Sequence, residues 1–239
     1  MRQVPPNDAA PIGIVGDGRL ARHLLHYLSL LGRPAINWSR RSSSGDPPEA
    51  LESCQTIVVL LRDAEIVPFI ERWPALRRTS LVHCSGGLVT NLAECAHPLM
   101  TFGEALYDLA TYERVPFITD IGRTPFEQLL PGLPNPSFAI PAEARPYYHA
   151  LCVMAGNFST LLWRKLFDEL EGRFGIPAWA AHGYLAKIAA NLETDAGRAL
   201  TGPLSRGDAA TIAANLRALE GDPFHQVYAA FVRAYESRP

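Results

Sequence analysis

The stretch Gly13–Ala21, GIVGDGRLA, decides the fold class of this 239-residue chain. It places Gly16, Gly18 and Ala21 in a G-x-G-x-x-A pattern between an apolar run and a leucine-rich segment. The first glycine permits a tight turn, and the second lets a pyrophosphate approach the backbone. A small third residue lets the following helix pack closely on the strand. The pattern predicts a turn that binds dinucleotide phosphates at a helix N-terminus. The alternative interpretation is an ordinary glycine turn.

The segments around this turn predict alternating strands and helices. Residues 12–16 form a short apolar run typical of a buried parallel strand. After it, leucines at 20, 24, 28 and 31 share one helical face, and Gly32 is placed to end the helix. Further strands are expected at residues 35–39, 56–62, 79–85, 116–120 and 137–140, with a crossover helix at 65–73 broken near Pro68. This alternation predicts an α/β fold with a Rossmann-like parallel sheet.

The second half of the chain predicts helices only. Residues 146–174 read as one long helix whose first half is apolar nearly all round, which indicates burial between other helices. Further helices are expected at 179–200, 208–220 and 224–236, with a loop at 201–208 and Asp208 as an N-cap. We therefore expect a flexible leader at 1–10, a Rossmann-like domain at 11–142 and a smaller all-helical domain at 143–239. The helical domain could complete its core against a second chain, so we expect a homodimer.

The composition excludes several classes of protein. The chain is 48% hydrophobic and 19% charged with a net charge of −2, and no run of basic residues exceeds a pair, which argues against a nucleic-acid partner. The first residues lack the apolar region of a signal peptide, and the most apolar run is too short to span a membrane. Four scattered cysteines and the absence of a metal-ligand spacing argue against a disulfide scaffold and a metal site. With no nucleophile elbow, hydrolase and metalloenzyme functions are also excluded, and we expect a soluble cytoplasmic protein.

The end of the second strand predicts which dinucleotide binds. An NAD site usually has an acidic residue there for the ribose hydroxyls. Here the residues are Ser39, Arg40, Arg41 and Ser42, and no acid precedes Asp46. Guanidinium groups bind a ribose 2′-phosphate with paired hydrogen bonds, so NADP(H) is the predicted cofactor. The alternative is a solvated basic turn. In the glycine turn itself, Arg19 is a weaker candidate for a phosphate contact.

These residues carry a resemblance to a known group of enzymes. The N-terminal half resembles the Rossmann domains of the 6-phosphogluconate dehydrogenase superfamily, which includes β-hydroxyacid dehydrogenases and ketopantoate reductases. More closely, the chain is similar to predicted oxidoreductases that pair a Rossmann-like domain with a helical domain of unassigned function. The matching stretches are GIVGDGRLA, HCSGGL, HPLMTFG, HALCVMAGNF and LTGPLSRGDAATIAANLRAL. The chain departs from the pattern at Ala21, where glycine is common, and at Asp195, where ketopantoate reductases have a second asparagine.

The resemblance implies a catalytic lysine in the helical domain, with an asparagine one turn later. Lys187 and Asn191 match those positions in GYLAKIAAN, and Asp195 follows at the same helical spacing. Lys187 is one of only two lysines among 22 basic residues, and a lysine amine, unlike a guanidinium, can deliver a proton. We expect Lys187 to protonate the substrate oxygen and Asn191 to orient it. The alternative is a polar stripe that faces water.

Five further residues are candidates for the site. Asn157 interrupts an apolar helix, so its amide either ties helices together or orients substrate in a cleft, and the resemblance favours the cleft. Ser85 follows a predicted strand and either contacts the nicotinamide or closes a turn. For the substrate the candidates are His97, His149 and Arg206. The alternatives are a turn residue for His97, a histidine capped by local backbone for His149, and an ion pair with Asp208 for Arg206.

Together these features predict an NADPH-dependent oxidoreductase that acts on a CH–OH or C=O group. The expected reaction transfers hydride to or from a small oxo or hydroxy acid, as in β-hydroxyacid dehydrogenases or ketopantoate reductases. The alternatives are an NADP reductase linked to an imine or a deazaflavin, and a catalytically silent protein that binds NADP as a sensor or interaction module.

Overall fold

A computed structural model describes residues 10–43 and 45–238 of the chain, so the expected flexible leader lies, apart from residue 10, outside the described residues. The chain divides into two compact units, Met1–Leu161 and Leu162–Pro239. Residue 142, where the sequence predicts the change from strands to helices, lies within the first unit. The first helix beyond that point therefore belongs to the first unit by its contacts.

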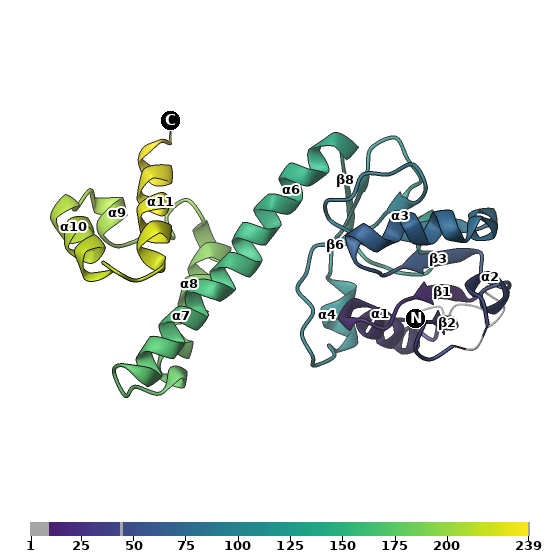
Figure 1. The fold of residues 1–239 in the computed structure, drawn as a ribbon, viewed down its shortest axis with the longest axis horizontal. Helices are drawn as coiled ribbons and strands as arrows, with labels where there is room; N and C mark the ends of the chain where they lie inside the picture. Colours follow the sequence, from purple (N-terminus) through teal and green to yellow (C-terminus); the bar gives the residue numbers. More distant parts are fainter. Residues whose placement is uncertain (1–9, 44, 239) are drawn as a thin grey trace. The chain divides into compact units, whose positions relative to one another are not determined.

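The first unit contains a parallel sheet with the strand order β2-β1-β3-β4-β5 (Figure 1). The strands are β1 (Ile12–Val15), β2 (Ala35–Trp38), β3 (Thr56–Val59), β4 (Ser80–His83) and β5 (Glu94–Cys95). Every neighbouring pair is parallel. The order reverses direction between β1 and β3, and the carboxyl ends on either side of such a switch point form the usual ligand crevice of an open α/β sheet. The predicted α/β fold with a Rossmann-like sheet is confirmed.

Helices cover both faces of this sheet because alternate strand residues point to opposite sides. Ile12, Ile14 and Val58 pack against α1 (Arg19–Leu30), where Leu24 and Leu28 are buried, as the leucine stripe predicts. On the other face, Ile57 and Val59 pack against α3 (Asp63–Arg72) and its buried Ile66 and Ile70. Both faces are therefore apolar, which explains why these strands lack an alternating polar pattern. A short helix, α2 (Pro47–Ala50), precedes β3.

The helix α3 corrects one expectation. Pro68 lies inside the helix and does not break it, and the helix runs without interruption from Asp63 to Arg72. Proline in a helix interior removes one backbone hydrogen bond, but burial of the apolar face of α3 against the sheet compensates for that loss.

A second, three-stranded sheet has the order β6-β7-β8. Its strands are β6 (His97–Pro98), β7 (Phe117–Asp120) and β8 (Ser137–Ile140), and the short helices α4 (Leu109–Glu113) and α5 (Phe126–Leu129) lie between them in sequence. The strands expected near 116–120 and 137–140 are therefore present, but they form this separate sheet rather than extending the first one. β7 and β8 are parallel, and β6 and β7 are antiparallel.

The predicted long helix is continuous but contains a widened turn (Figure 1). It consists of α6 (Arg145–Cys152), a π-helical turn (Val153–Phe158) and α7 (Ser159–Gly172). The expected burial of its first half is wrong for the single chain, because the side chains of Leu151, Met154 and Phe158 are exposed. The apolar surface of this helix is therefore free to pack against another molecule.

Over residues 162–238 the second unit contains the rest of α7, a 3-10 turn (Ala178–Ala181) and four further α-helices. They are α8 (His182–Asp195), α9 (Pro203–Arg206), α10 (Ala209–Ala218) and α11 (Phe224–Glu236). The segment expected as a loop at 201–208 contains the single turn α9, which ends at Gly207 in the left-handed conformation. Asp208 caps α10 as predicted, because its side chain accepts a hydrogen bond from the Thr211 backbone N–H.

Candidate functional site

The glycine turn after β1 has the geometry that its sequence predicts. Gly16 has a φ of +125°, and a Cβ atom there would overlap the carbonyl oxygen of Leu60, the residue that follows β3. Only glycine fits this position, because the left-handed backbone and the close approach each exclude a side chain. Asn37 of β2 supports the turn, since its amide donates hydrogen bonds to the carbonyls of Ile14 and Gly16, at 3.1 and 2.8 Å. By contrast, no atom lies within 4 Å of a Cβ built on Gly18, so the space over its backbone is open.

The helix after the turn presents free backbone donors and an arginine to that open space. Gly18 is the N-cap of the 12-residue helix α1 and no side chain caps it, so N–H groups of its first turn remain available for an anion. Ala21 is buried, as a small residue in the close helix–strand contact must be. Arg19 is largely exposed and lies 3.7 Å from Glu104, which also pairs with Arg22 at 2.9 Å. The residues present therefore fit a bound pyrophosphate.

The loop after β2 carries two exposed guanidinium groups. The side chains of Arg40 and Arg41 are 78% and 89% exposed, and their nearest acids, Glu65 and Asp17, lie 3.8 and 3.9 Å away. Exposed ion pairs at such distances are weak, so an anionic ligand can replace the carboxylates.

Two serines of the same loop hold its shape. Ser39 is buried, and its hydroxyl lies 2.7 Å from the Ser42 hydroxyl. The Ser39 side chain therefore positions the loop that carries the arginines, and its hydroxyl is already engaged within the loop.

Ser85 follows β4, and its hydroxyl is engaged on both sides. It donates a 2.7 Å hydrogen bond to Asp63 Oδ2 and accepts one from the Leu88 backbone N–H at 3.0 Å. It thus closes the turn at Gly86 and Gly87 and ties this turn to the start of α3. Ser85 therefore closes a turn, which is one of the two roles expected for it. Its position at the carboxyl edge of the sheet is also compatible with the other expected role, contact with the nicotinamide.

His97, Tyr148 and His149 form a cluster of polar rings beside this turn. His97 Nδ1 lies 3.0 Å from the Tyr148 hydroxyl, and the His97 and His149 rings meet edge to face with centroids 5.8 Å apart. His149 packs so closely on the Gly86 backbone that a Cβ there would overlap its Nδ1, which is buried without a hydrogen-bond partner. Local backbone therefore does not cap the His149 ring, and the two histidines expected near the substrate are brought together.

A buried ion pair beneath this cluster was missed by sequence reasoning. Arg145 is 1% exposed, donates a 2.5 Å hydrogen bond from Nη2 to the Ser85 carbonyl, and lies 3.4 Å from both carboxylate oxygens of Asp120. It fastens α6 to the ends of β4 and β7. Nothing in the local sequence indicates the pairing, because the partners lie 25 and 60 residues from Arg145.

Burial keeps two histidines of this region, His83 and His97, neutral. Desolvation and the positive charges of Arg145 and Arg123 lower the pKa of His83 to about 3. Desolvation, His149 and Arg145 lower the pKa of His97 to about 4, while Asp63 acts in the opposite direction. Burial and the neighbouring Cys152 raise the pKa of the Tyr148 hydroxyl, and Arg145 offsets part of that rise. At neutral pH the His97–Tyr148 pair is therefore an uncharged imidazole beside a protonated phenol.

Of the remaining catalytic candidates, Lys187 and Asn157 are exposed on helices, and Asn191 is partly buried. Lys187 and Asn191 occupy successive turns of α8 in the second unit, and Lys187 is exposed without a hydrogen bond or ion pair among the described residues. Asp195 ends α8, where its carboxylate accepts hydrogen bonds from the backbone of Gly197 and Arg198. Asn157 is exposed within the π-helical turn of the first unit. The glycine turn, also in the first unit, and Lys187 thus belong to different units.

Arg206 has no carboxylate within ion-pair distance among the described residues, but its positive charge adds to the Thr211 hydrogen bonds in lowering the pKa of Asp208. The Asp208 carboxylate is instead engaged by Thr211, through the backbone N–H and the hydroxyl. Arg206 is exposed at the end of α9. Its guanidinium is available for an anion, which leaves the carboxylate-binding role open.

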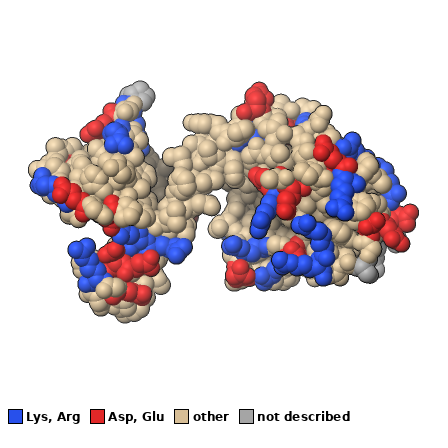
Figure 2. All heavy atoms as spheres, in the orientation of Figure 1, with Lys and Arg blue, Asp and Glu red and all other residues tan. Residues whose placement is uncertain are grey.

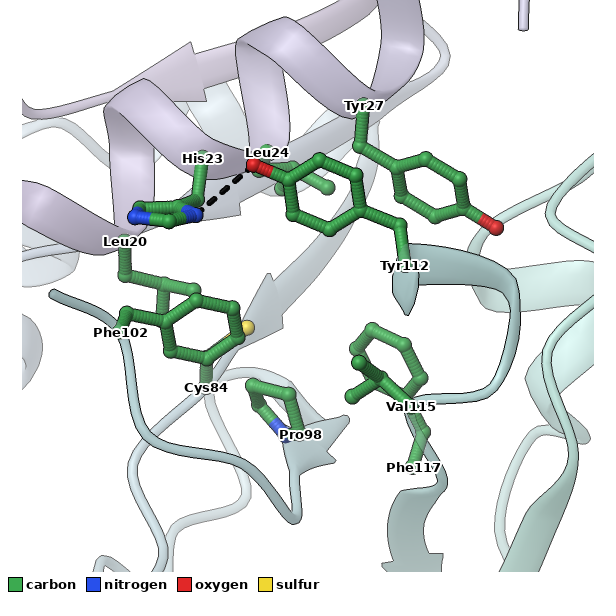
Figure 3. A pocket seen from close by; sticks show the side chains of 10 residues that line it. All are labelled: Leu20, His23, Leu24, Tyr27, Cys84, Pro98, Phe102, Tyr112, Val115 and Phe117. Carbon is green, nitrogen blue, oxygen red and sulfur yellow. Dashed lines mark hydrogen bonds between the residues drawn. The ribbon is translucent and has the colours of Figure 1, made fainter. Parts of the chain in front are cut away.

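An apolar cavity under α1 lies next to the sheet and carries no functional polar group (Figure 3). His23, which points into it, is satisfied at both ring nitrogens, by the Tyr112 hydroxyl at 2.8 Å and the Gly103 carbonyl at 3.0 Å. Leu20, Phe102 and Val115 line the rest of the wall with other apolar side chains. This cavity belongs to the core, whereas the polar clusters lie at the carboxyl edge of the sheet.

The surface charge is mixed over the first unit. On the face drawn in Figure 2, basic and acidic side chains alternate over this unit, and the surface along α6 is almost free of charge. No group of three or more His, Cys, Asp or Glu side chains within residues 10–43 and 45–238 could hold a metal ion. In the same part of the chain, no helix is both long and apolar enough to cross a membrane.

Comparison with known proteins identifies one family model and several similar structures. Residues 120–235 match a family described as a domain of unknown function, DUF2520. No curated protein matches the chain.

The similar structures cover nearly the whole chain. A Bacteroides fragilis protein, provisionally described as an NADP oxidoreductase, is 19% identical with a TM-score of 0.76 and covers 97% of this chain and 100% of its own. A Streptomyces aurantiacus imine reductase is 14% identical with a TM-score of 0.66, covering 95% of this chain and 93% of its own. Plasmodium falciparum pyrroline carboxylate reductase, solved with NADP bound, is 13% identical with a TM-score of 0.60, covering 95% and 96%. The chain shares their fold. At these identities the likeness concerns the fold alone.

Proposed function

We propose that the protein is an NADPH-dependent oxidoreductase. The observation that carries this proposal is the turn at Gly16 and Gly18, where one glycine is required by the backbone and the other leaves open space over a helix N-terminus. The turn lies at the switch point of the parallel sheet, where dinucleotides bind in this fold. The NADP oxidoreductases and reductases among the similar structures support the same cofactor. When bound, the dihydronicotinamide would supply a hydride.

The preference for NADPH over NADH is assigned to the loop after β2. Arg40 and Arg41 are the groups that would hold the 2′-phosphate, because both are exposed and only weakly paired. No acidic side chain takes the place at which an NAD site holds the ribose hydroxyls. Arg19 would contact the pyrophosphate after separating from Glu104.

For the substrate, we propose a small oxo or hydroxy acid. Lys187 would protonate the substrate oxygen, Asn191 and Asn157 would orient it, and Arg206 would bind the carboxylate. Asn157 lies in a π-helical turn, a distortion that is often found at functional sites. This assignment requires the exposed face of α8 to meet the cofactor in the working enzyme.

A second candidate substrate is a compound with a C=N bond. It is favoured by the names of two similar structures, the imine reductase and the pyrroline carboxylate reductase. Both substrate classes need hydride at carbon and a proton at the neighbouring oxygen or nitrogen, so the same site can serve either.

We further propose that the working form is a homodimer. In the described part of the second unit, residues 162–238, the buried apolar residues are only Ala181 and Val232, whereas Phe174, Trp179 and Phe231 are exposed. A unit of this size needs more buried apolar surface to be stable, and a second copy of the chain would supply it. Light scattering should give twice the 26.2 kDa of one chain. Phe158→Glu, on the exposed face of the π-helical turn, should shift the protein toward the monomer.

The function is tested by fluorescence titration with NADPH and with NADH, followed by turnover with 2-oxobutanoate and 2-methyl-1-pyrroline. We expect NADPH to bind at least about tenfold more tightly than NADH, which corresponds to about 1.4 kcal/mol. Absence of NADPH binding would contradict the proposal. Tight binding without turnover of either compound or of a deazaflavin, unchanged by Lys187→Ala, would instead indicate a silent sensor. A selective loss of turnover in Lys187→Ala would support the lysine as proton donor.

A further inference from the structure

We propose that Tyr148, in place of the Lys187 considered above, is the catalytic residue that delivers the proton to the substrate, and that His97 is the positioning residue that returns a proton to Tyr148. This inference rests on the proposed oxidoreductase function. Its starting point is the 3.0 Å contact between His97 Nδ1 and the Tyr148 hydroxyl. Both residues belong to the first unit, the one that contains the glycine turn.

The strand order places this pair on the nicotinamide side of the expected cofactor. The pyrophosphate turn follows β1, and the loop proposed for the adenosine ribose follows β2, at one end of the sheet. The other half of a dinucleotide must therefore extend across the ends of β3, β4 and β5. His97 follows β5, and the turn after β4 packs against His149, next to Tyr148 on α6. Hydride transfer is thus expected beside these rings.

The surroundings of His97 favour one direction of proton transfer. The groups that face it are Tyr148, His149 and Arg145 from α6, and Asp63 from α3. Burial, His149 and Arg145 lower the pKa of His97 to about 4, so the ring carries a single N–H at neutral pH. If that N–H is on Nδ1, it donates to the Tyr148 oxygen. The phenol proton is then not held by His97, and a substrate that replaces the neighbouring Cys152 thiol as hydrogen-bond partner can accept it.

The step balances with a hydride from the bound cofactor and a proton from water. The substrate carbon accepts the hydride, and its oxygen or nitrogen accepts the Tyr148 proton as the C=O or C=N double bond becomes single. The Tyr148 oxygen takes the Nδ1 proton of His97, and Nε2 of this part-buried ring takes a proton from water. Arg145, below the pair, stabilises the negative charge that develops on the phenol oxygen.

The cluster is built in a way that supports this role. Arg145 fixes the start of α6 by its hydrogen bond to the Ser85 carbonyl, so Tyr148, one helical turn later, is held at the edge of the sheet. Tyr147 offers a matched control, because it is the preceding tyrosine of the same helix and its side chain is 72% exposed.

The first test is nitrogen NMR of the histidine rings with and without NADP+. We expect His97 to remain in the neutral Nδ1–H tautomer from pH 5 to 8, and its signals to shift on NADP+ binding in the wild type and in Tyr147→Phe. An Nε2–H tautomer, or signals unchanged by bound NADP+, would overturn the inference even if neither test compound is turned over. If NADP+ and NADPH do not bind at all, the proposed function fails, and this inference fails with it.

The second test is single-turnover hydride transfer with 2-oxobutanoate or 2-methyl-1-pyrroline, whichever is reduced. Tyr148→Phe should slow the step at least about 100-fold at pH 8 with unchanged NADPH affinity, as expected for loss of a general acid. His97→Asn, whose amide can replace the Nδ1 donor, should retain more activity than His97→Leu and alter the pH profile. Equal rates in Tyr148→Phe and Tyr147→Phe would overturn the proposal.

Discussion

Arg145 Nη2 donates a 2.5 Å hydrogen bond to the backbone carbonyl of Ser85 while the same guanidinium faces the carboxylate of Asp120. One buried cation thus joins three elements, namely the turn after β4, the end of β7 and the start of α6. Its position fixes where the polar rings of α6 meet the carboxyl edge of the sheet.

Replacing Arg145 with leucine should destabilise the protein by about 3 kcal/mol, because Asp120 would remain as a buried charge without a partner. The free energy of unfolding in urea measures the effect. Arg145→Leu combined with Asp120→Asn should recover part of the loss, and Arg114→Leu, at an exposed position, should change stability little. A double variant less stable than the single one would contradict this account.

The two glycines of the turn should respond differently to alanine. Gly16→Ala should destabilise the fold by about 2 kcal/mol, since it forces a strained backbone and a clash with the Leu60 carbonyl. Gly18→Ala should leave stability nearly unchanged but weaken NADPH binding, because its methyl group would enter the space proposed for the pyrophosphate. Thermal unfolding and NADPH titration separate the two effects. Undiminished NADPH affinity in Gly18→Ala would argue against that space as the phosphate site.

Arg40→Ala should weaken NADPH binding about tenfold and NADH binding much less, because only NADPH carries the 2′-phosphate. Titration of both nucleotides checks the prediction. Arg77→Ala is the control. Arg77 precedes β4, so it lies at the amino ends of the strands and not at the carboxyl ends, where the cofactor is proposed to bind. Equal weakening of both nucleotides by Arg40→Ala would refute the 2′-phosphate assignment.

Stability should fall as the pH is lowered from about 6.5 toward 4. The folded state holds the pKa of His97 at about 4 and that of His83 at about 3, whereas in the unfolded chain each histidine titrates near its ordinary value of 6.5. The unfolded chain therefore binds more protons in this range. Each histidine adds a slope of up to about 1.4 kcal/mol per pH unit between its folded and unfolded pKa values. Its stabilising contribution is therefore complete above about 6.5 and is lost as the pH falls toward the folded pKa.

Urea unfolding at pH 5, 6 and 7 measures this slope. His97→Asn should reduce it, because the variant loses one of the two imidazoles whose pKa the folded state lowers to about 3 or 4. His182→Asn, at an exposed position on α8, should leave the slope as it is in the wild type. A slope unaffected by His97→Asn would mean that His97 titrates normally in the folded protein.

The features that could be predicted from sequence are those set by neighbouring residues. The glycine turn, the leucine stripe of α1 and the cap at Asp208 each depend on a few consecutive side chains, and all three are confirmed. The Arg145–Asp120 pair could not be predicted, because the fold alone brings those residues together. Pro68 misled the prediction of α3 because burial against the sheet outweighs one missing hydrogen bond.

The scarcity of lysine, which in the sequence suggested a catalytic role for Lys187, has a structural explanation for the other lysine. Lys165, the other lysine, lies 2.7 Å from Glu169 and 2.6 Å from Asp222, and so joins α7 to the start of α11. A compact ammonium between two carboxylates is a structural use of lysine, so rarity alone does not indicate catalysis. The case for Lys187 therefore rests on the family resemblance and the spacing to Asn191, which stay predictions until the titration and turnover experiments are done.

The π-helical turn at Val153–Phe158 makes the register of the long helix sensitive to a single codon. Such a turn accommodates one residue more than a regular α-helix needs. Deleting Gly156 would let the helix close into an α-helix and would rotate every later side chain by about 100° around its axis. Loss or gain of one amino acid at this turn would thus change which side chains of the later helix face a given side. In evolution, a chain of this fold could alter that helix surface by a single-residue insertion or deletion.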